Sequence, residues 1–326
     1  MKLKQLLIVI AGLLFMYSCG SEGESSGTRK DNKTSGEIYI AVDEAFAPIL
    51  EEHIVTFQRV YPDAKINLLQ MPAEKAIAAM VNSDSVRLAV ATRKPTQVEM
   101  DAVMSQNSAK IRSFDIAKDA IGLIVSKENK DSTLTQAQLR KILLGELVSW
   151  KDINPKSPYD QIQLVIDNGY SSTVADLQKM VLGDTSIRAK VVFKEDNVGV
   201  MNYVAQTPSA LGVIGVGWIS NSSSDRAKGF KSQFRVVELE GLPECKSPDK
   251  YFQPYQVFIK AGCYPLSRYV YVLNREPHMG LGTGFVTYLT EEKGQRIILK
   301  AGLVPTNALT RVVKFPPKEG SSSSGQ

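Results

Sequence analysis

The sequence predicts an α/β protein built as two lobes. From Glu37 onward, short β-branched runs alternate with amphipathic helical stretches, which is the pattern of a sheet covered by helices. The folded part is expected to span residues 37–315, and apolar residues make up 43% of the whole chain. A segment of this size can bury one large core or two modest ones, which favours two lobes.

The expected elements follow one another without an internal repeat. Runs rich in β-branched residues predict strands at 38–42, 65–69, 86–91, 111–114, 120–125, 163–166, 211–216 and 269–273. Apolar residues at helical spacing predict helices at 48–61, 73–81, 97–104, 136–143, 172–182, 198–205 and 285–301.

Residues 1–18 have the features of a secretory signal. Lys2 and Lys4 form a charged start, and the apolar run at 6–17 is too short to span a membrane comfortably. The following segment, Met16-Tyr17-Ser18-Cys19-Gly20, resembles a lipobox, in which the cysteine becomes the lipidated first residue of the mature protein. We therefore expect export and attachment to a membrane through Cys19. The alternative is an ordinary cleaved signal with an incidental cysteine.

Two segments are expected to be flexible. Residues 19–36 form a tether, because 20–36 contain no hydrophobic residue that could offset the entropy of ordering. The tail at 316–326 has a similar composition and is expected to be disordered.

The charge of the chain excludes some partners. The formal charge of +5 includes Lys2 and Lys4, and falls to +3 once these two are removed. A mature chain this close to neutrality gives no reason to expect nucleic acid as a partner.

The cysteines and histidines predict a disulfide and no metal site. After Cys19, only Cys245 and Cys263 remain, and we expect them to pair in an oxidising compartment; two buried free thiols are the alternative. The two histidines, His53 and His278, have no Cys or His at metal-ligand spacing, so neither a metal nor another cofactor is expected. We expect His53 to be a surface or packing residue of a helix, and His278 to be exposed in a loop.

Five segments, in order along the chain, resemble the phosphate-binding family of type II periplasmic binding proteins. They are KDAIGLIV at 118–125, a helix followed by a tryptophan at 134–150, VAQTPSALG at 204–212, YPLSRYVYV at 264–272, and the ending from Gly294-Gln295 to AGLVP at 301–305. Together they cover nearly the whole of residues 37–305.

The resemblance implies a periplasmic binding protein type II fold, with two α/β lobes joined by two crossing hinge strands. Lobe 1 would comprise residues 37–119 plus 267–315, and lobe 2 residues 120–266. A ligand would bind between the lobes, which would close on it by hinge motion. The resemblance also implies an ABC permease as partner and no enzyme activity.

The resemblance further implies a set of anion ligands. The family binds phosphate with Ser and Gly at helix N-termini and with an arginine. Ser171-Ser172-Thr173 resembles its Ser-Gly-Thr loop, and Thr92-Arg93 resembles its Ser-Arg turn after the third strand. Taken alone, Arg93 could equally form a surface ion pair with Asp43 or Glu74, and Ser171 and Thr173 could only cap their helix.

Other cleft positions depart from the family pattern and carry acidic or bulky side chains. They are Asp43, Glu44 and Phe46 after the first strand, Glu74 after the second strand, and Asp167, which stands where the family has an arginine. Asp43 and Glu44 also fit as carboxylates of a first helical turn. A carboxylate close to bound phosphate lowers affinity unless a cation or a proton lies between them.

These features lead to one principal function and one alternative. The principal hypothesis is a solute-binding lipoprotein that captures phosphate or a related oxyanion between two lobes for an ABC importer. The alternative is a non-transport envelope sensor or partner-binding module on the same scaffold. An exported hydrolase is disfavoured, because there is no Gly-x-Ser-x-Gly motif and no histidine placed to serve a nucleophile.

Overall fold

The computed structural model of the chain describes residues 31–220 and 232–307. The predicted signal at 1–18, the lipid attachment site Cys19, most of the tether and the tail at 316–326 lie outside the described residues. Within the described part of the chain, no helix has the length and apolar character needed to cross a membrane.

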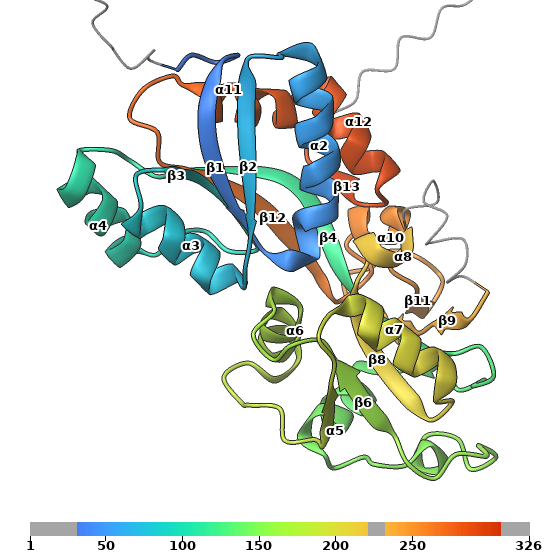
Figure 1. Cartoon of the computed structure of the whole chain (residues 1–326). Coiled ribbons are helices and arrows are strands. Elements are labelled where there is room, and N and C mark those ends of the chain that lie inside the picture. Colours follow the sequence, from blue (N-terminus) through green and yellow to red (C-terminus); the bar gives the residue numbers. More distant parts are fainter. Residues whose placement is uncertain (1–30, 221–231, 308–326) are drawn as a thin grey trace, which may run out of the picture.

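Two α/β lobes meet at a narrow waist, which β4 (Arg112–Ser126) crosses (Figure 1). The upper lobe in this view, lobe 1, also contains the strands β1 (Gly36–Val42), β2 (Ala64–Gln70), β3 (Val86–Ala91), β12 (Ser267–Asn274) and β13 (Val304–Pro305). Its helices are η1 (Glu44–Phe46), α2 (Ala47–Val60), α3 (Ala73–Asn82), α4 (Gln97–Asn107), α11 (Leu281–Thr290) and α12 (Glu292–Lys300). The predicted α/β class is confirmed.

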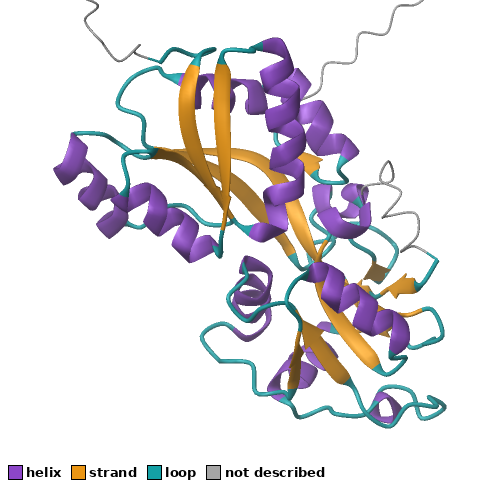
Figure 2. Ribbon diagram, in the orientation of Figure 1, coloured by secondary structure: helices purple, strands orange, loops and turns teal. Residues whose placement is uncertain are grey.

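The sheet of lobe 1 is buried on both faces. Its order is β2-β1-β3-β12-β4, with β1, β2 and β3 parallel and β12 antiparallel to both of its neighbours. Along β1, Ile40 packs toward α2, α11 and α12, whereas Ala41 packs toward α3 and α4 on the other face (Figure 2). This alternation is why β1 is apolar at successive positions.

The lower lobe, lobe 2, carries a second sheet and its own core. Its strands are β5 (Thr133–Leu134), β6 (Gln163–Ile166), β7 (Val191–Phe193), β8 (Ala210–Gly215), β9 (Phe234–Val236), β10 (Glu238–Glu240) and β11 (Tyr251–Phe252). Its helices are α5 (Gln136–Leu144), η2 (Trp150–Asp152), α6 (Ser172–Leu182), α7 (Asn197–Gln206), α8 (Gly217–Ser220) and α10 (Gln256–Lys260). Trp150 and Tyr264 are fully buried in this core, and the Tyr264 hydroxyl donates to the carbonyl of Ile121 (2.8 Å).

The two lobes share β4, where the sequence predicted two separate strands at 111–114 and 120–125. Residues 112–120 pair with β12 in lobe 1, and residues 121–125 pair with β8 in lobe 2. The strand continues through residues 115–119, between the two predicted strands, because Ile116 and Ala117 in this segment are buried. At the waist, Ile121 N donates to Leu266 O (2.9 Å), which joins the two crossing segments. The division of the lobes at 119/120 and 266/267 stays a prediction.

The long helix expected at 285–301 is two helices, α11 and α12. Glu291 between them has an extended backbone (φ −82°, ψ 170°). A Cβ atom at Gly294 would lie only 2.3 Å from the carbonyl oxygen of Tyr288, so glycine permits this close turn. Apolar residues at helical spacing lie on both sides of the polar segment 290–296, and this pattern alone did not reveal the break.

The expected flexible tether ends earlier than Gly36. Asp31 is paired with Arg87 and His278, and its carboxylate accepts from Leu281 N at the start of α11 (3.1 Å). These contacts lower the pKa of the Asp31 carboxyl, against the effect of burial, which raises it. The residues from 31 to 36 therefore belong to lobe 1, because one charged side chain fixes them to it.

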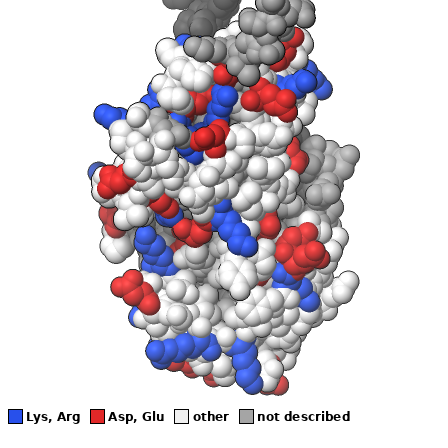
Figure 3. Space-filling view, turned by 60° about the vertical axis from the view of Figure 1, so that its left-hand side comes forward, with Lys and Arg blue, Asp and Glu red and all other residues white. Residues whose placement is uncertain are grey.

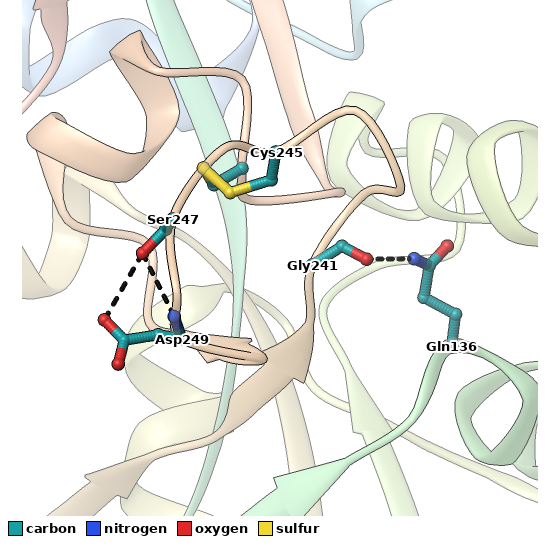
Figure 4. The surroundings of a disulfide bond; sticks show 6 residues. Gln136, Gly241, Cys245, Ser247 and Asp249 are labelled. Carbon is teal, nitrogen blue, oxygen red and sulfur yellow. Dashed lines mark hydrogen bonds between the residues drawn. A yellow bond between two sulfur atoms is a disulfide. The ribbon is translucent and has the colours of Figure 1, made fainter.

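Cys245 and Cys263 are joined by a disulfide, which closes a loop with a sequence separation of 18 (Figure 4). Near the disulfide, the Gln136 side chain donates to Gly241 O (3.0 Å), and the backbone N–H of Asp249 donates to Ser247 Oγ (3.3 Å). In the chain-entropy model, a cross-link of this span stabilises the folded protein by about 3 kcal/mol, because it lowers the conformational entropy of the unfolded chain.

His53 is completely buried on α2, and neither ring nitrogen has a hydrogen-bond partner in the structure. Its ring packs edge-on against Tyr288, with the two ring centroids 5.9 Å apart. Burial lowers the pKa of His53 to about 3, so the imidazole is neutral in the folded protein. Of the two expected roles, packing is the one that the structure supports.

Replacing His53 with Leu should flatten the acid side of the stability–pH profile. As the pH falls below about 6.5, the unfolded chain gains a proton at His53 that the folded chain does not accept until about pH 3. For each pH unit of acidification in this range, the unfolding free energy of the native protein should therefore fall by about 1.4 kcal/mol more than that of the variant. Urea unfolding at several pH values measures this difference. Parallel profiles for the two proteins would contradict it.

Candidate functional site

The loop after β1 carries an aspartate that reaches across to lobe 2. Asp43 is 1% exposed, and one carboxylate oxygen accepts from Ala45 N within its own loop (2.9 Å). The same carboxylate accepts from the hydroxyl of Ser172 (3.0 Å) and from the backbone N–H of Ser172 (3.3 Å). Asp43 therefore binds the first turn of α6 from the opposite lobe.

The N-terminus of α6 is a buried set of hydrogen-bond donors. Ser171 is the N-cap, and its hydroxyl accepts from Val174 N (3.3 Å). Ser172 and Thr173 follow in the first turn and are 3% and 0% exposed. Free N–H groups and the helix dipole favour an anion at such a terminus. The sequence predicted this cluster, and the structure brings all three residues to the face of lobe 2 that meets Asp43.

Arg268, on β12 at the waist, is a cation that contacts this cluster. Its guanidinium is paired with Asp119 on β4 (2.9 Å) and with Asp176 on α6 (3.0 Å). It also donates to the hydroxyls of Ser172 and Thr173, at 3.3 Å each. Burial alone would lower the pKa of Arg268, but the adjacent carboxylates raise it, so the guanidinium stays charged.

Phe46 forms one wall beside this cation. Its ring is 2% exposed, and its centroid lies 5.2 Å from the Arg268 guanidinium carbon. A guanidinium over an aromatic face is held by the negative charge of the π-system. Sequence reasoning missed Arg268 as a site residue. The available signal was an arginine in the return crossing together with an aspartate in the first crossing.

Glu44 and Asp167 add further negative charge at the same place. Glu44 accepts from the Asn168 side chain of lobe 2 (3.1 Å). Asp167 is buried, and accepts from the Ser171 hydroxyl (2.6 Å) and the Asn197 side chain (3.3 Å). Burial raises the pKa of Asp167 to about 6, and the charges of Asp43 and Glu44 add to this shift.

Arg93 lies in lobe 1, and two carboxylates hold it. Glu74 binds it in bidentate fashion (2.8 and 2.6 Å), and so does Glu99 (2.9 and 2.8 Å). Arg93 lowers the pKa of Glu99 to about 2. Of the two interpretations of Arg93 drawn from the sequence, this geometry matches the ion pair with Glu74. Thr92 beside it is partly buried. A role of either residue in anion binding stays a prediction.

A pocket of about 180 Å³ lies beside the waist and has walls from both lobes. Phe46 and Ile49 line it from lobe 1, Gly215 and Trp218 line it from lobe 2, and Asp119 borders it at the waist. A Cβ atom at Gly215 would lie 3.7 Å from Trp218 Cδ1 and 4.0 Å from Arg268 Nη2. These are ordinary contact distances, so a methyl group would fit at Gly215 between the indole and the guanidinium.

Charged side chains of both signs are spread over the surface, whereas inside the cleft the carboxylates outnumber the single guanidinium of Arg268. On the face shown in Figure 3, Lys and Arg side chains lie intermingled with Asp and Glu. Among the described residues, no group of three or more His, Cys, Asp or Glu side chains is arranged to hold a metal ion. The arrangement is suited to holding a small anion by hydrogen bonds and one guanidinium.

The chain matches known proteins over most of its length. A family model described as the PBP superfamily domain matches residues 27–293. A curated relative, the phosphate-binding protein PstS of Staphylococcus epidermidis, is 24% identical over 298 residues, which is 88% of this chain and 84% of that protein. The protein of the same name from Staphylococcus aureus strain USA300 is 24% identical over 293 residues, covering 88% and 83% of the two chains.

Solved structures resemble the fold. A candidate phosphate ABC transporter substrate-binding protein from Clostridium perfringens, solved with bound phosphate, has a TM-score of 0.66 at 20% identity. It aligns over 83% of this chain and 100% of that one. An ABC-type phosphate transport receptor from Vibrio cholerae has a TM-score of 0.61 at 19% identity, over 83% and 100% of the two chains. These likenesses confirm the predicted two-lobed fold.

Replacing Asp167 with Asn should stabilise the protein at neutral pH and have little effect near pH 4. The folded-state pKa of about 6 exceeds the ordinary 3.8, so the native protein loses stability as the pH rises between these values. Removing this ionisation should recover roughly 3 kcal/mol at pH 7. Melting temperatures at both pH values test this, with the exposed Asp63→Asn as the control. An equal gain at both pH values would contradict the assignment to ionisation.

Proposed function

This chain belongs to the PBP superfamily, and from that premise we propose that it is a solute-binding lipoprotein that captures phosphate or a related oxyanion for an ABC importer. The relatives named as phosphate-binding proteins extend over 88% of the chain, so the likeness spans both lobes. The protein acts in this proposal by binding and release and not by catalysis.

The observation that carries the proposal is the meeting of Arg268 with the α6 N-terminus between the lobes. Both are buried, and they are joined through the hydroxyls of Ser172 and Thr173 at 3.3 Å. An oxyanion placed there would accept from the Ser172 N–H and from both hydroxyls, while the guanidinium supplies the positive charge. Because the donors come from lobe 2 and from the waist, the anion would fix the angle between the lobes.

The lipid anchor and the transport partner belong to the same proposal. A signal at 1–18 and lipidation at Cys19 would place the protein in the cell envelope, attached to a membrane, with residues 20–30 as the remaining tether. The partner would be the permease of the importer, to which the two lobes deliver the anion. Labelling of cells with a radioactive fatty acid tests the anchor, because Cys19→Ser should abolish incorporation of the label.

Titration calorimetry of the Cys19→Ser chain tests the binding activity. Phosphate should give a saturable heat with one site per chain. Arsenate should compete for the same site, because it has the same shape and charge. Absence of binding to phosphate, arsenate, sulfate and molybdate would contradict the proposed function.

A comparison of two arginine variants tests where the anion binds. Arg268→Lys should weaken phosphate binding by about thirtyfold or more, because a buried guanidinium donates in a geometry that an ammonium cannot reproduce. Arg93→Ala should have a clearly smaller effect, since the Arg93 guanidinium bonds to Glu74, Glu99 and Lys94 O in lobe 1 and not to the N-terminus of α6. The exposed Arg235→Ala in lobe 2 is the matched control. A larger loss at Arg93 than at Arg268 would place the anion at the turn after β3.

A further inference from the structure

The cleft contains an anionic group of the protein itself at the place proposed for the ligand. The Asp43 carboxylate accepts from both the N–H and the hydroxyl of Ser172, which are the donors that an oxyanion would use. The Ser172 hydroxyl also accepts from Arg268 (3.3 Å), so carboxylate and guanidinium share one hydroxyl. Asp43 thereby makes at α6 the contacts expected of a small bound anion.

This contact crosses from one lobe to the other. Asp43 follows β1 in lobe 1, and Ser172 begins α6 in lobe 2. A second hydrogen bond also links the two lobes: Glu44, next to Asp43 in lobe 1, accepts from the Asn168 side chain of lobe 2 (3.1 Å). In contrast, the bond from Ala45 N to Asp43 lies within one loop of lobe 1 and does not depend on lobe 2. The lobes can therefore separate while the Asp43 side chain keeps its partner at Ala45.

We propose that Asp43 is an internal competitor for the anion and so determines the affinity of the cleft. This inference rests on the proposed function. Two anions cannot share the Ser172 donors, because like charges at such a separation repel strongly in a buried site. The incoming anion must displace the Asp43 carboxylate from α6. The apparent affinity for the anion is then the intrinsic affinity multiplied by the fraction of molecules in which the Ser172 donors are free of Asp43.

Displacement also explains why an acidic loop can be present at an anion site. Once released from Ser172, the carboxylate remains bonded to Ala45 N at the start of η1. The anion would take over the contact with the α6 N-terminus, and closure of the lobes would be held by ligand in place of Asp43. The same donors would serve both states in turn.

Calorimetry with phosphate on the Cys19→Ser chain tests the inference. Asp43→Ala should bind phosphate at least about tenfold more tightly than the unsubstituted chain, because the competitor is gone. Asp43→Asn should lie between the two, since a neutral amide can still occupy the site but does not repel the ligand. Glu37→Gln removes one carboxylate from β1 of the same lobe, away from α6, and should leave the affinity unchanged.

The outcomes separate this inference from the proposed function. Phosphate binding that is unchanged or weaker in both Asp43 variants would overturn the competitor role and leave the proposed function intact. A lack of binding by every form would overturn both. Binding by Asp43→Ala alone would support both, as the extreme case of competition.

Small-angle scattering gives an independent measurement. Without added phosphate, Asp43→Ala should have a larger radius of gyration than the unsubstituted chain, because a link between the lobes is lost. With saturating phosphate the two radii should agree. Equal radii in the absence of phosphate would contradict a role of Asp43 in holding the lobes together. Melting curves of each variant establish that the comparison is made on folded protein.

Discussion

The buried ion pair between Arg268 and Asp119 is the interaction on which the rest of the cleft depends. The two residues are direct register partners on β12 and β4, and the side chains of both are 2% exposed. A charge buried this deeply is tolerated only when it is paired and hydrogen-bonded, and Asp119 satisfies one edge of the guanidinium. The other edge is thereby directed at α6, where it meets Asp176, Ser172 and Thr173. One pair at the waist thus positions a cation between two lobes.

The surroundings of this cation are unusually acidic for a site that would hold an anion. Asp119, Asp176 and Asp43 all contribute to the electrostatics of Arg268, while Glu74 and Glu99 hold Arg93. A site whose donors already have carboxylate partners gains less from binding an anion than one with free donors, because each contact is an exchange. Weaker net binding is compatible with transport, since a carrier must also release its cargo.

Much of the fold could be predicted from local patterns, because short strands and amphipathic helices have distinct periodicities. The continuity of β4 between its two predicted halves and the break at Glu291 were missed, since both depend on tertiary contacts and not on local preference. The helix start at Ser171, Ser172 and Thr173 could be predicted because a cap and the first turn are adjacent in sequence, and its choice as a candidate site came from the resemblance to the Ser-Gly-Thr loop of the family. Arg268 was missed, because its neighbours at 119 and 172 are about a hundred or more positions away and meet it only in the folded chain.

A crystal structure of the protein grown with saturating phosphate tests the central claim most directly. We expect a tetrahedral anion bonded to Ser172, Thr173 and Arg268, with the Asp43 carboxylate turned away from α6 and still bonded to Ala45 N. An intact contact between Asp43 and Ser172, with phosphate bound elsewhere or not at all, would contradict both the location of the site and the role assigned to Asp43.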